Sequence, residues 1–449
     1  MASMEKLNTH QKALRINLDS TSYGSFAEIG AGQEVVRWFM VVGGASGTVA
    51  KSISAYDKEV SDDLYGSGAR YVSAERLQAM LNSEWSQLIN QLNKSRGSNA
   101  RFFAFVDTIS ARNYAGTNEP HGWVGLRFQL QPGGQSNDII LHVNLRDPSN
   151  SLEQEAIGIL GVNLIYAAFY QLEPRESFFR NIAQDLDKRI EIDYAEVSGP
   201  AFEGWNQRAI LVQLVCTGLA EAVCFPCSGP PVPPLEIIHK KATVLAPGSF
   251  EHLDSAHAAI HNQLLAAGIR QLREELSEND PAPIGFFCFS AMPLRDEDPA
   301  PAISDLLERI DALHRHCGDV LLFRERELYG MTGLVNRYTR ERIRFVVGLS
   351  LLVRVWEYRY TKLAGSFLEA LSRLLAQNVR IYAFPMSSRD LEEAIQSIST
   401  IRWHWTDTDG LVSARQLHPP PPLGHLYDYI LASNFLVPLE IPGAVAANE

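Results

Sequence analysis

Short apolar runs alternate with amphipathic stretches along most of the chain, and this alternation predicts its secondary structure. In the first half, the strand candidates are 35–43, 101–110, 122–130, 138–146, 189–197 and 210–218. Between them, residues 73–95 and 152–172 repeat apolar side chains every three to four positions, as helices that cover a sheet do. Strands and helices in such alternating layers predict an α/β fold.

A proline-rich stretch from Cys224 to Glu236 interrupts this pattern and predicts a stiff linker. It divides the chain into an N-terminal α/β domain over 1–230, whose role the sequence does not indicate, and a second domain over 236–449. Strand–helix units in the second domain begin near residues 242, 283, 319, 342 and 379. This series predicts a Rossmann-like, doubly wound parallel sheet, with ligands bound beyond the carboxyl ends of its strands.

Composition narrows the classes of partner. The chain has 449 residues, of which 46% are hydrophobic and 20% charged, as expected for a folded protein of several domains. Its formal net charge of −12 argues against nucleic acid or an anionic membrane as the main partner. The longest apolar run, 345–356, is short and contains Arg354, so no membrane span is expected. Five unevenly spaced cysteines and an N-terminus without a signal-peptide core predict a cytoplasmic protein.

The segment from Lys240 to Gly268 offers the first candidate site. An apolar strand ends in Gly248 and Ser249, Phe250 follows, and His257 lies at the start of the next helix. A Gly-Ser turn of this kind directs the free N–H groups of the helix toward a bound anion. The arrangement resembles the nucleotidyltransferase motif of nicotinate and nicotinamide mononucleotide adenylyltransferases. The resemblance implies ATP and Mg²⁺ as cofactors, with His257 as the catalytic residue and the Gly-Ser-Phe turn as the binding element.

The segment also departs from that motif. His252 and Asp254 stand where the family has a proline and a threonine or histidine. A carboxylate beside a triphosphate is repulsive unless a cation intervenes. Residues 398–402 match the second signature of the family only in part. The resemblance implies that Arg402 is a weak triphosphate contact. A purely structural strand–helix corner is the more conservative interpretation.

The whole chain is similar to an uncharacterised bacterial family. The similarity rests on residues 15–39, 43–57, 121–129 and 161–170. Members of that family carry automatic labels such as nicotinamide mononucleotide adenylyltransferase or TonB-dependent receptor. The receptor label conflicts with an N-terminus that lacks a signal-peptide core.

A second glycine-rich turn, at residues 43–47, precedes Lys51 and Ser52. A strand, a glycine loop and a helix that begins with Lys-Ser would have the layout of a phosphate loop. The motif requires glycines where this chain has Ala45 and Ala50. An unusual anion site at Lys51 and Ser52 and a packed turn without a ligand are both consistent with the sequence.

Other clusters suggest weaker alternatives. Lys51, Asp107, His121 and Arg127 could form an enzyme site for a phosphorylated metabolite in the first domain. Cys224 and Cys227 form a CxxC pair, but the prolines that follow exclude a thioredoxin-like helix, and no metal site is expected.

Two functions from different classes remain after this comparison. The first is a cytoplasmic protein that binds a nucleotide or phosphorylated metabolite, in the narrow form an adenylyltransferase that acts on a mononucleotide with ATP. The alternative is a non-catalytic, self-assembling scaffold with degenerate nucleotide sites. The apolar helix around residues 161–172 supports the alternative, which predicts a homo-oligomer.

Overall fold

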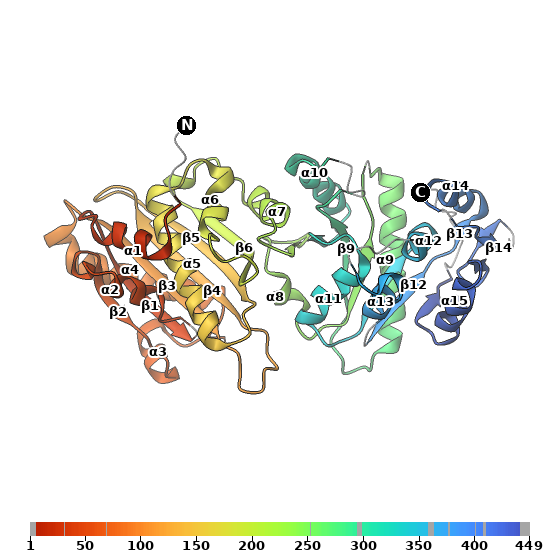
Figure 1. The fold of residues 1–449 in the computed structure, drawn as a ribbon, viewed down its shortest axis with the longest axis horizontal. Helices are drawn as coiled ribbons and strands as arrows, with labels where there is room; N and C mark the ends of the chain where they lie inside the picture. The colour runs from red at the N-terminus through yellow and green to blue at the C-terminus, as the bar shows by residue number, and fades with distance from the viewer. Residues whose placement is uncertain are drawn as a thin grey trace. The chain divides into compact units, whose positions relative to one another are not determined.

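The chain folds into two compact units, Met1–Ala220 and Glu221–Glu449 (Figure 1). The computed structural model describes residues 6–30, 32–68, 70–251, 253–293, 299–357, 363–375, 378–399, 401–406 and 410–440. Both units combine a sheet with helices, which confirms the predicted α/β class. The boundary between them precedes the proline-rich stretch, because β7 (Ala222–Phe225) already pairs with the sheet of the second unit.

A six-stranded mixed sheet forms the first unit. Its strands are β1 (Ser22–Gly30), β2 (Val49–Ile53), β3 (Arg101–Ser110), β4 (His121–Gln129), β5 (Ser136–Leu145) and β6 (Ile190–Ser198). They lie in the order β2-β1-β3-β4-β5-β6, with β1 parallel to both of its neighbours and the strands from β3 to β6 antiparallel. The helices are α1 (Thr9–Asn17), α2 (Val35–Val41), α3 (Lys58–Tyr65), α4 (Ala74–Arg96), α5 (Asn150–Tyr170), α6 (Arg175–Ile182) and α7 (Gln207–Thr217).

Helices cover both faces of this sheet. Gly125 of β4 lies against Leu77 and Leu81 of α4. Phe128, three residues along and therefore on the opposite face, contacts Phe169 of α5 at 5.8 Å between ring centroids. Most of α5 is buried, so the apolar sequence of residues 161–172 is explained by packing within the unit. It therefore does not support self-association, which stays a prediction.

The strand predictions for residues 35–43 and 210–218 are wrong, because residues 35–41 and 210–217 are helical. In α2 the carboxylate of Glu28 accepts hydrogen bonds from the N–H groups of Val35 and Val36, which stabilises the first turn. In α7 the side chain of Asn206 caps the start, and Gly218 ends the helix in a left-handed conformation with φ 78°. Both runs are apolar on several faces, so their periodicity did not separate helix from strand.

A parallel sheet forms the second unit, as predicted. Its main strands are β7, β8 (Thr243–Pro247), β9 (Ile284–Ser290), β10 (Val320–Phe323), β11 (Ile343–Val347), β12 (Val379–Ala383) and β17 (Leu436–Pro438). Its helices are α8 (Pro234–Ile238), α9 (Ser255–Glu275), α10 (Ile303–His314), α11 (Leu328–Tyr338), α12 (Leu349–Glu357), α13 (Ser366–Leu374), α14 (Ser388–Ile398) and α15 (Leu423–Ala432). Short two-residue strands, β13 (Met386–Ser387) with β15 (Leu411–Val412) and β14 (His404–Trp405) with β16 (Leu417–His418), form two small ladders.

The strand order of this sheet is β17-β12-β11-β8-β9-β10-β7, and only β7 is antiparallel. The chain builds outward from β8 to β9 and β10 on one side, then returns to place β11 and β12 on the other. This is the order of a doubly wound Rossmann sheet, and its direction switches between β8 and β11. Crevices at such switch points bind ligands, so the carboxyl ends of β8 and β11 locate the expected site.

No helix in the described part of the chain combines the length and the apolar character that crossing a membrane requires.

Candidate functional site

A cavity of about 460 Å³ lies at the switch point of the second unit. Its walls come from the carboxyl end of β9 and from the segments that follow β8, β10 and β11. These segments are far apart in sequence and meet at the carboxyl edge of the sheet. Gly248, Ser249, Phe250 and His257 all line it. The structure therefore brings together the four residues of the predicted nucleotidyltransferase motif.

Packing explains the conformation of the Gly-Ser-Phe turn. Phe250 is buried and adopts a positive φ of 51°, which folds its ring back over the end of the sheet. The ring contacts His261, Phe287 and Phe289 at centroid distances of 5.2, 5.6 and 6.2 Å. A Cβ atom on Gly248 would lie 2.7 Å from this ring, so any larger residue there would require the ring to move. Ser249 is exposed, and its carbonyl accepts a hydrogen bond of 3.2 Å from Arg309.

Asp254 covers the start of α9. Its carboxylate accepts the backbone N–H of His257 at 2.9 Å and lies 2.9 Å from Nδ1 of the same histidine. The amide and one ring nitrogen that a triphosphate would use are thus engaged with a protein carboxylate. A phosphate could bind at this helix end only by displacing Asp254 or beside a cation. His252, the other departure from the motif, lies outside the described residues.

The wall of the cavity that α12 forms contains a cation that the sequence analysis did not identify as a site residue. Arg354 of α12 lines the cavity, is exposed, and makes no side-chain hydrogen bond or ion pair within the described residues. Gly348, Ser350 and Leu351 place the first turn of α12 in the same wall. A helix start and an arginine on one wall both favour an anion.

The sequence contains a signal for the start of α12, the helix that forms this wall. The apolar run 345–356 covers two elements, because β11 ends at Val347 and α12 begins at Leu349. Gly348 marks the break, and buried Leu349, Leu352, Val353 and Trp356 then recur at helical spacing.

The remaining predicted contacts lie elsewhere. Arg402 is exposed and is not among the described residues that line the cavity. Lys51 and Ser52 lie on strand β2 of the first unit, so the expected helix at this point is wrong. A helix, α2, precedes the glycine turn in place of the expected strand, and the layout of a phosphate loop is absent from this described segment. Lys51 instead pairs with the buried carboxylate of Glu84 at 2.6 Å.

The candidate side chains of the alternative site in the first unit contact different partners. Arg127 forms a bidentate pair with Asp138, with both hydrogen bonds at 2.7 Å. The rings of His121 and His142 lie 3.0 Å apart between nitrogens, and His142 contacts Asp193. Because each candidate side chain has its own partner, they do not converge on one described cavity.

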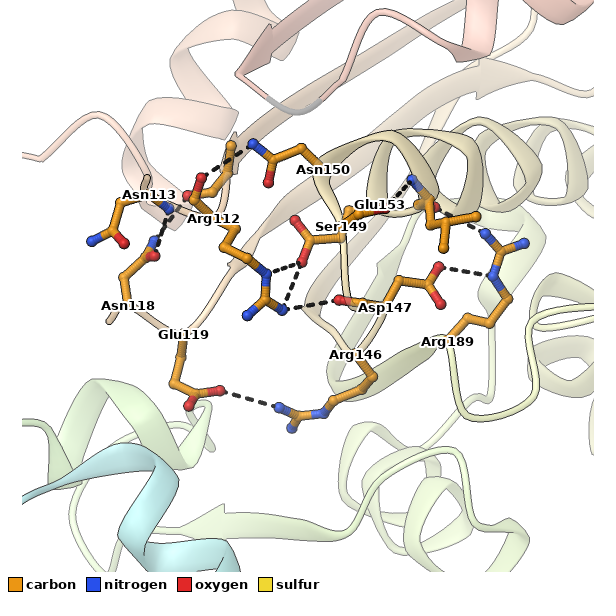
Figure 2. A network of polar contacts seen from close by, with 12 residues as sticks. Arg112, Asn113, Asn118, Glu119, Arg146, Asp147, Ser149, Asn150, Glu153 and Arg189 are labelled. Atoms are coloured by element: carbon orange, nitrogen blue, oxygen red, sulfur yellow. Dashed lines mark hydrogen bonds and ion pairs between the residues drawn. The ribbon is translucent and has the colours of Figure 1, made fainter. Parts of the chain in front are cut away.

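A polar network at one end of this sheet shows how the first unit uses its arginines internally (Figure 2). Arg112 donates to Glu153 at 3.0 Å and to the carbonyl of Asp147 at 2.9 Å. Arg189 donates to the carboxylate of Asp147 at 2.8 Å. These contacts tie the start of α5 to the ends of neighbouring strands, which is a structural role. They contrast with Arg354, which lines a cavity.

Asp107 is fully buried beside Glu28, on paired positions of β1 and β3. Burial first, and then the charge of Glu28, raise the pKa of the Asp107 carboxyl well above its usual range. Burial also raises the pKa of Glu28, but backbone N–H donors from Val35, Val36 and Gln33 oppose the shift. Asp107 has one such donor, from Ile29 at 3.1 Å, so it holds the proton of the pair.

A protonated Asp107 predicts that the free energy of unfolding depends on pH. Between the unfolded and the folded pKa of Asp107, the native state keeps a proton that the unfolded chain releases, so stability falls as pH rises. We expect Asp107→Asn to remove this contribution, which for one proton is at most about 1.4 kcal/mol per pH unit. Urea unfolding between pH 4 and pH 8 measures it. An equal slope in both proteins would contradict the assignment.

The comparisons with known proteins are weak. No family model matches the chain, and no curated protein matches it. Among solved structures, competence/damage inducible protein CihA from Agrobacterium tumefaciens matches at 21% identity and a TM-score of 0.24, over 33% of this chain and 88% of that one. A CinA superfamily protein from Klebsiella pneumoniae 700603 matches at 16% identity and a TM-score of 0.24, over 36% and 95%.

A third match has the same character. It is the competence damage-inducible protein A (ComA) of Klebsiella pneumoniae subsp. pneumoniae MGH 78578, at 15% identity and a TM-score of 0.25, over 36% of this chain and 94% of that one. None of the three descriptions names an adenylyltransferase. TM-scores this low assign no activity to the present chain.

Proposed function

We propose that the second unit binds a nucleotide or another small phosphorylated molecule in the switch-point cavity. The observation that carries this proposal is the position of Arg354. It lines a cavity at the carboxyl edge of a doubly wound sheet and has no carboxylate partner in the described part of the chain. Sites at this edge commonly bind phosphates, and arginine binds phosphate oxygens with two hydrogen bonds.

Both polar and apolar side chains line the cavity. Arg354, Ser350 and the first turn of α12 offer positive charge and hydrogen-bond donors for a phosphate. Leu328, Met331 and other apolar side chains also line the cavity, and a base or sugar could pack against them. A volume of about 460 Å³ is in the range of small-molecule sites.

Adenylyl transfer is the narrower form of this proposal. In that reaction an oxygen of the mononucleotide phosphate attacks the α-phosphorus of ATP, and pyrophosphate leaves with its bonding electron pair. Gly248, Ser249 and His257 line the switch-point cavity, as adenylyl transfer would require. Asp254, however, lies where the triphosphate would bind. No group of three or more metal-ligating side chains occurs among the described residues, so Mg²⁺ would enter bound to the nucleotide. Binding without transfer is therefore better supported than catalysis.

Asp254→Asn tests the proposal. Asparagine caps helices as well as aspartate does, so α9 should remain intact. Removing the negative charge is expected to raise ATP affinity about fivefold, which corresponds to roughly 1 kcal/mol for a charge near the surface. Isothermal titration with ATP, ADP and inorganic phosphate measures it. Absence of binding by both proteins would refute the proposed function.

An unchanged affinity in the asparagine variant, with clear binding by the wild type, would remove the start of α9 from the site. In that case the nucleotide would contact the α12 wall alone. Production of pyrophosphate from ATP and a mononucleotide, measured with both proteins, separates transfer from binding.

A further inference from the structure

A second and larger cavity of the second unit, about 800 Å³, lies beside α11. Its lining comes from α11, from the Arg324–Arg326 segment after β10, from Met292 and Pro293 after β9, and from α13. Arg326 lines both this cavity and the switch-point cavity, so the two adjoin at that residue.

Its charges favour an anion. Four arginines and two glutamates line it, and both glutamates are already engaged. Glu325 accepts backbone N–H groups of Arg326 and Glu327 at 2.9 and 3.1 Å, and Glu221 pairs with Arg337. Arg324 is exposed and makes no side-chain hydrogen bond or ion pair within the described part of the chain. Arg326, Arg337 and Arg373 pair with Glu327, Glu221 and Glu369, so among the described residues Arg324 is the lining guanidinium without a carboxylate partner.

Apolar side chains also line this cavity. Met292 is 40% exposed, which is high for a methionine, and it shares the wall with Pro293, Tyr329 and Leu334. A ligand with a flat apolar body and an anionic group would match both parts of the lining. Inorganic phosphate alone would leave the apolar wall unused.

Gly333 supplies an independent observation. It lies in the middle of α11, where glycine costs about 1 kcal/mol of helix stability relative to alanine. A Cβ atom at Gly333 would meet nothing within 4 Å, so packing gives no reason for the missing side chain. Gly330, one turn earlier, differs because Glu325 lies against it, 2.2 Å from a Cβ atom built there. The open position at Gly333 keeps the cavity wall clear.

We propose that this cavity binds an aromatic or otherwise apolar organic anion, with Arg324 at its anionic group and the face of α11 at Gly333 against its body. The site is separate from the switch-point cavity, and the two ligands would meet at Arg326. The proposal goes beyond nucleotide binding and does not depend on it.

The test uses 8-anilinonaphthalene-1-sulfonate, a fluorescent aromatic sulfonate, titrated into the full chain. Arg324→Gln is expected to weaken its binding about tenfold, the effect of losing one charge-assisted hydrogen bond. Gly333→Leu places a good helix former into open space, so we expect loss of dye binding with no decrease in melting temperature. Arg340→Gln is the matched control, because Arg340 is exposed and lines neither cavity.

The outcomes separate this site from the proposed nucleotide site. Arg354→Gln should leave dye binding unchanged, and Gly333→Leu should leave ATP binding unchanged. Dye affinity within twofold of wild type in both Arg324→Gln and Gly333→Leu would overturn the proposal. Absence of saturable dye binding by the wild type would overturn it as well, whatever the result with ATP.

Discussion

Replacing Arg354 with glutamine is expected to weaken ATP binding by the second unit about tenfold. Hydrogen bonds to charged groups contribute about 1.5–3 kcal/mol, and the exposure of Arg354 favours the lower end of this range. Glutamine keeps a long polar side chain and loses only the charge and the forked geometry. Since Arg354 has no partner to lose in the described structure, the fold should be unaffected. Titration calorimetry at one fixed salt concentration measures the change.

Arg402→Gln is the informative control for this experiment. The sequence motif predicts Arg402 as a triphosphate contact, whereas it is not among the described residues that line the cavity. We therefore expect the affinity of this variant to lie within twofold of wild type. If Arg402→Gln weakened binding and Arg354→Gln did not, the nucleotide would bind elsewhere than in the switch-point cavity.

Replacing Phe250 with alanine is expected to destabilise the second unit by about 3 kcal/mol. Truncation of a buried phenylalanine typically costs 3–5 kcal/mol, because the ring contacts are lost and a cavity remains. Phe250 is 5% exposed and contacts three other rings. The lower end of the range fits a ring at the edge of the sheet, where the site can partly collapse.

Urea unfolding of the second unit measures this effect, with Tyr429→Ala as the control. Tyr429 is 61% exposed, so its truncation should change stability by less than about 0.5 kcal/mol. A cost below about 1 kcal/mol for Phe250→Ala would show that the Gly-Ser-Phe turn is not held by packing. The motif would then need a ligand-based explanation.

The second unit could be predicted from sequence because its strands are short, apolar and separated by clear helices. The parallel sheet and the position of the Gly-Ser-Phe turn at its carboxyl edge followed from this pattern. The wall formed by α12 could not be predicted, because β11 and α12 form one apolar run with only Gly348 between them. In the sequence, Arg354 was noted only as the charge that argues against a membrane span in this run.

Other features depend on contacts within the folded chain and could not be predicted from the sequence. Glycine at position 248 gives room to the ring of Phe250, which adopts a positive φ. Asp254 was identified as incompatible with the motif, but its role as the cap of α9 required the structure. In the first unit, α2 read as a strand, because the carboxylate that caps it, Glu28, comes from a strand missed in the sequence.

Hydrogen–deuterium exchange with and without saturating ATP tests the central claim most directly, because it locates the ligand in the whole chain. Binding in the switch-point cavity predicts slower exchange in peptides that cover residues 247–251 and 347–354. Peptides that cover Lys51 and Ser52 in the first unit should not change. Protection confined to the first unit, or to residues 401–406, would contradict the claim.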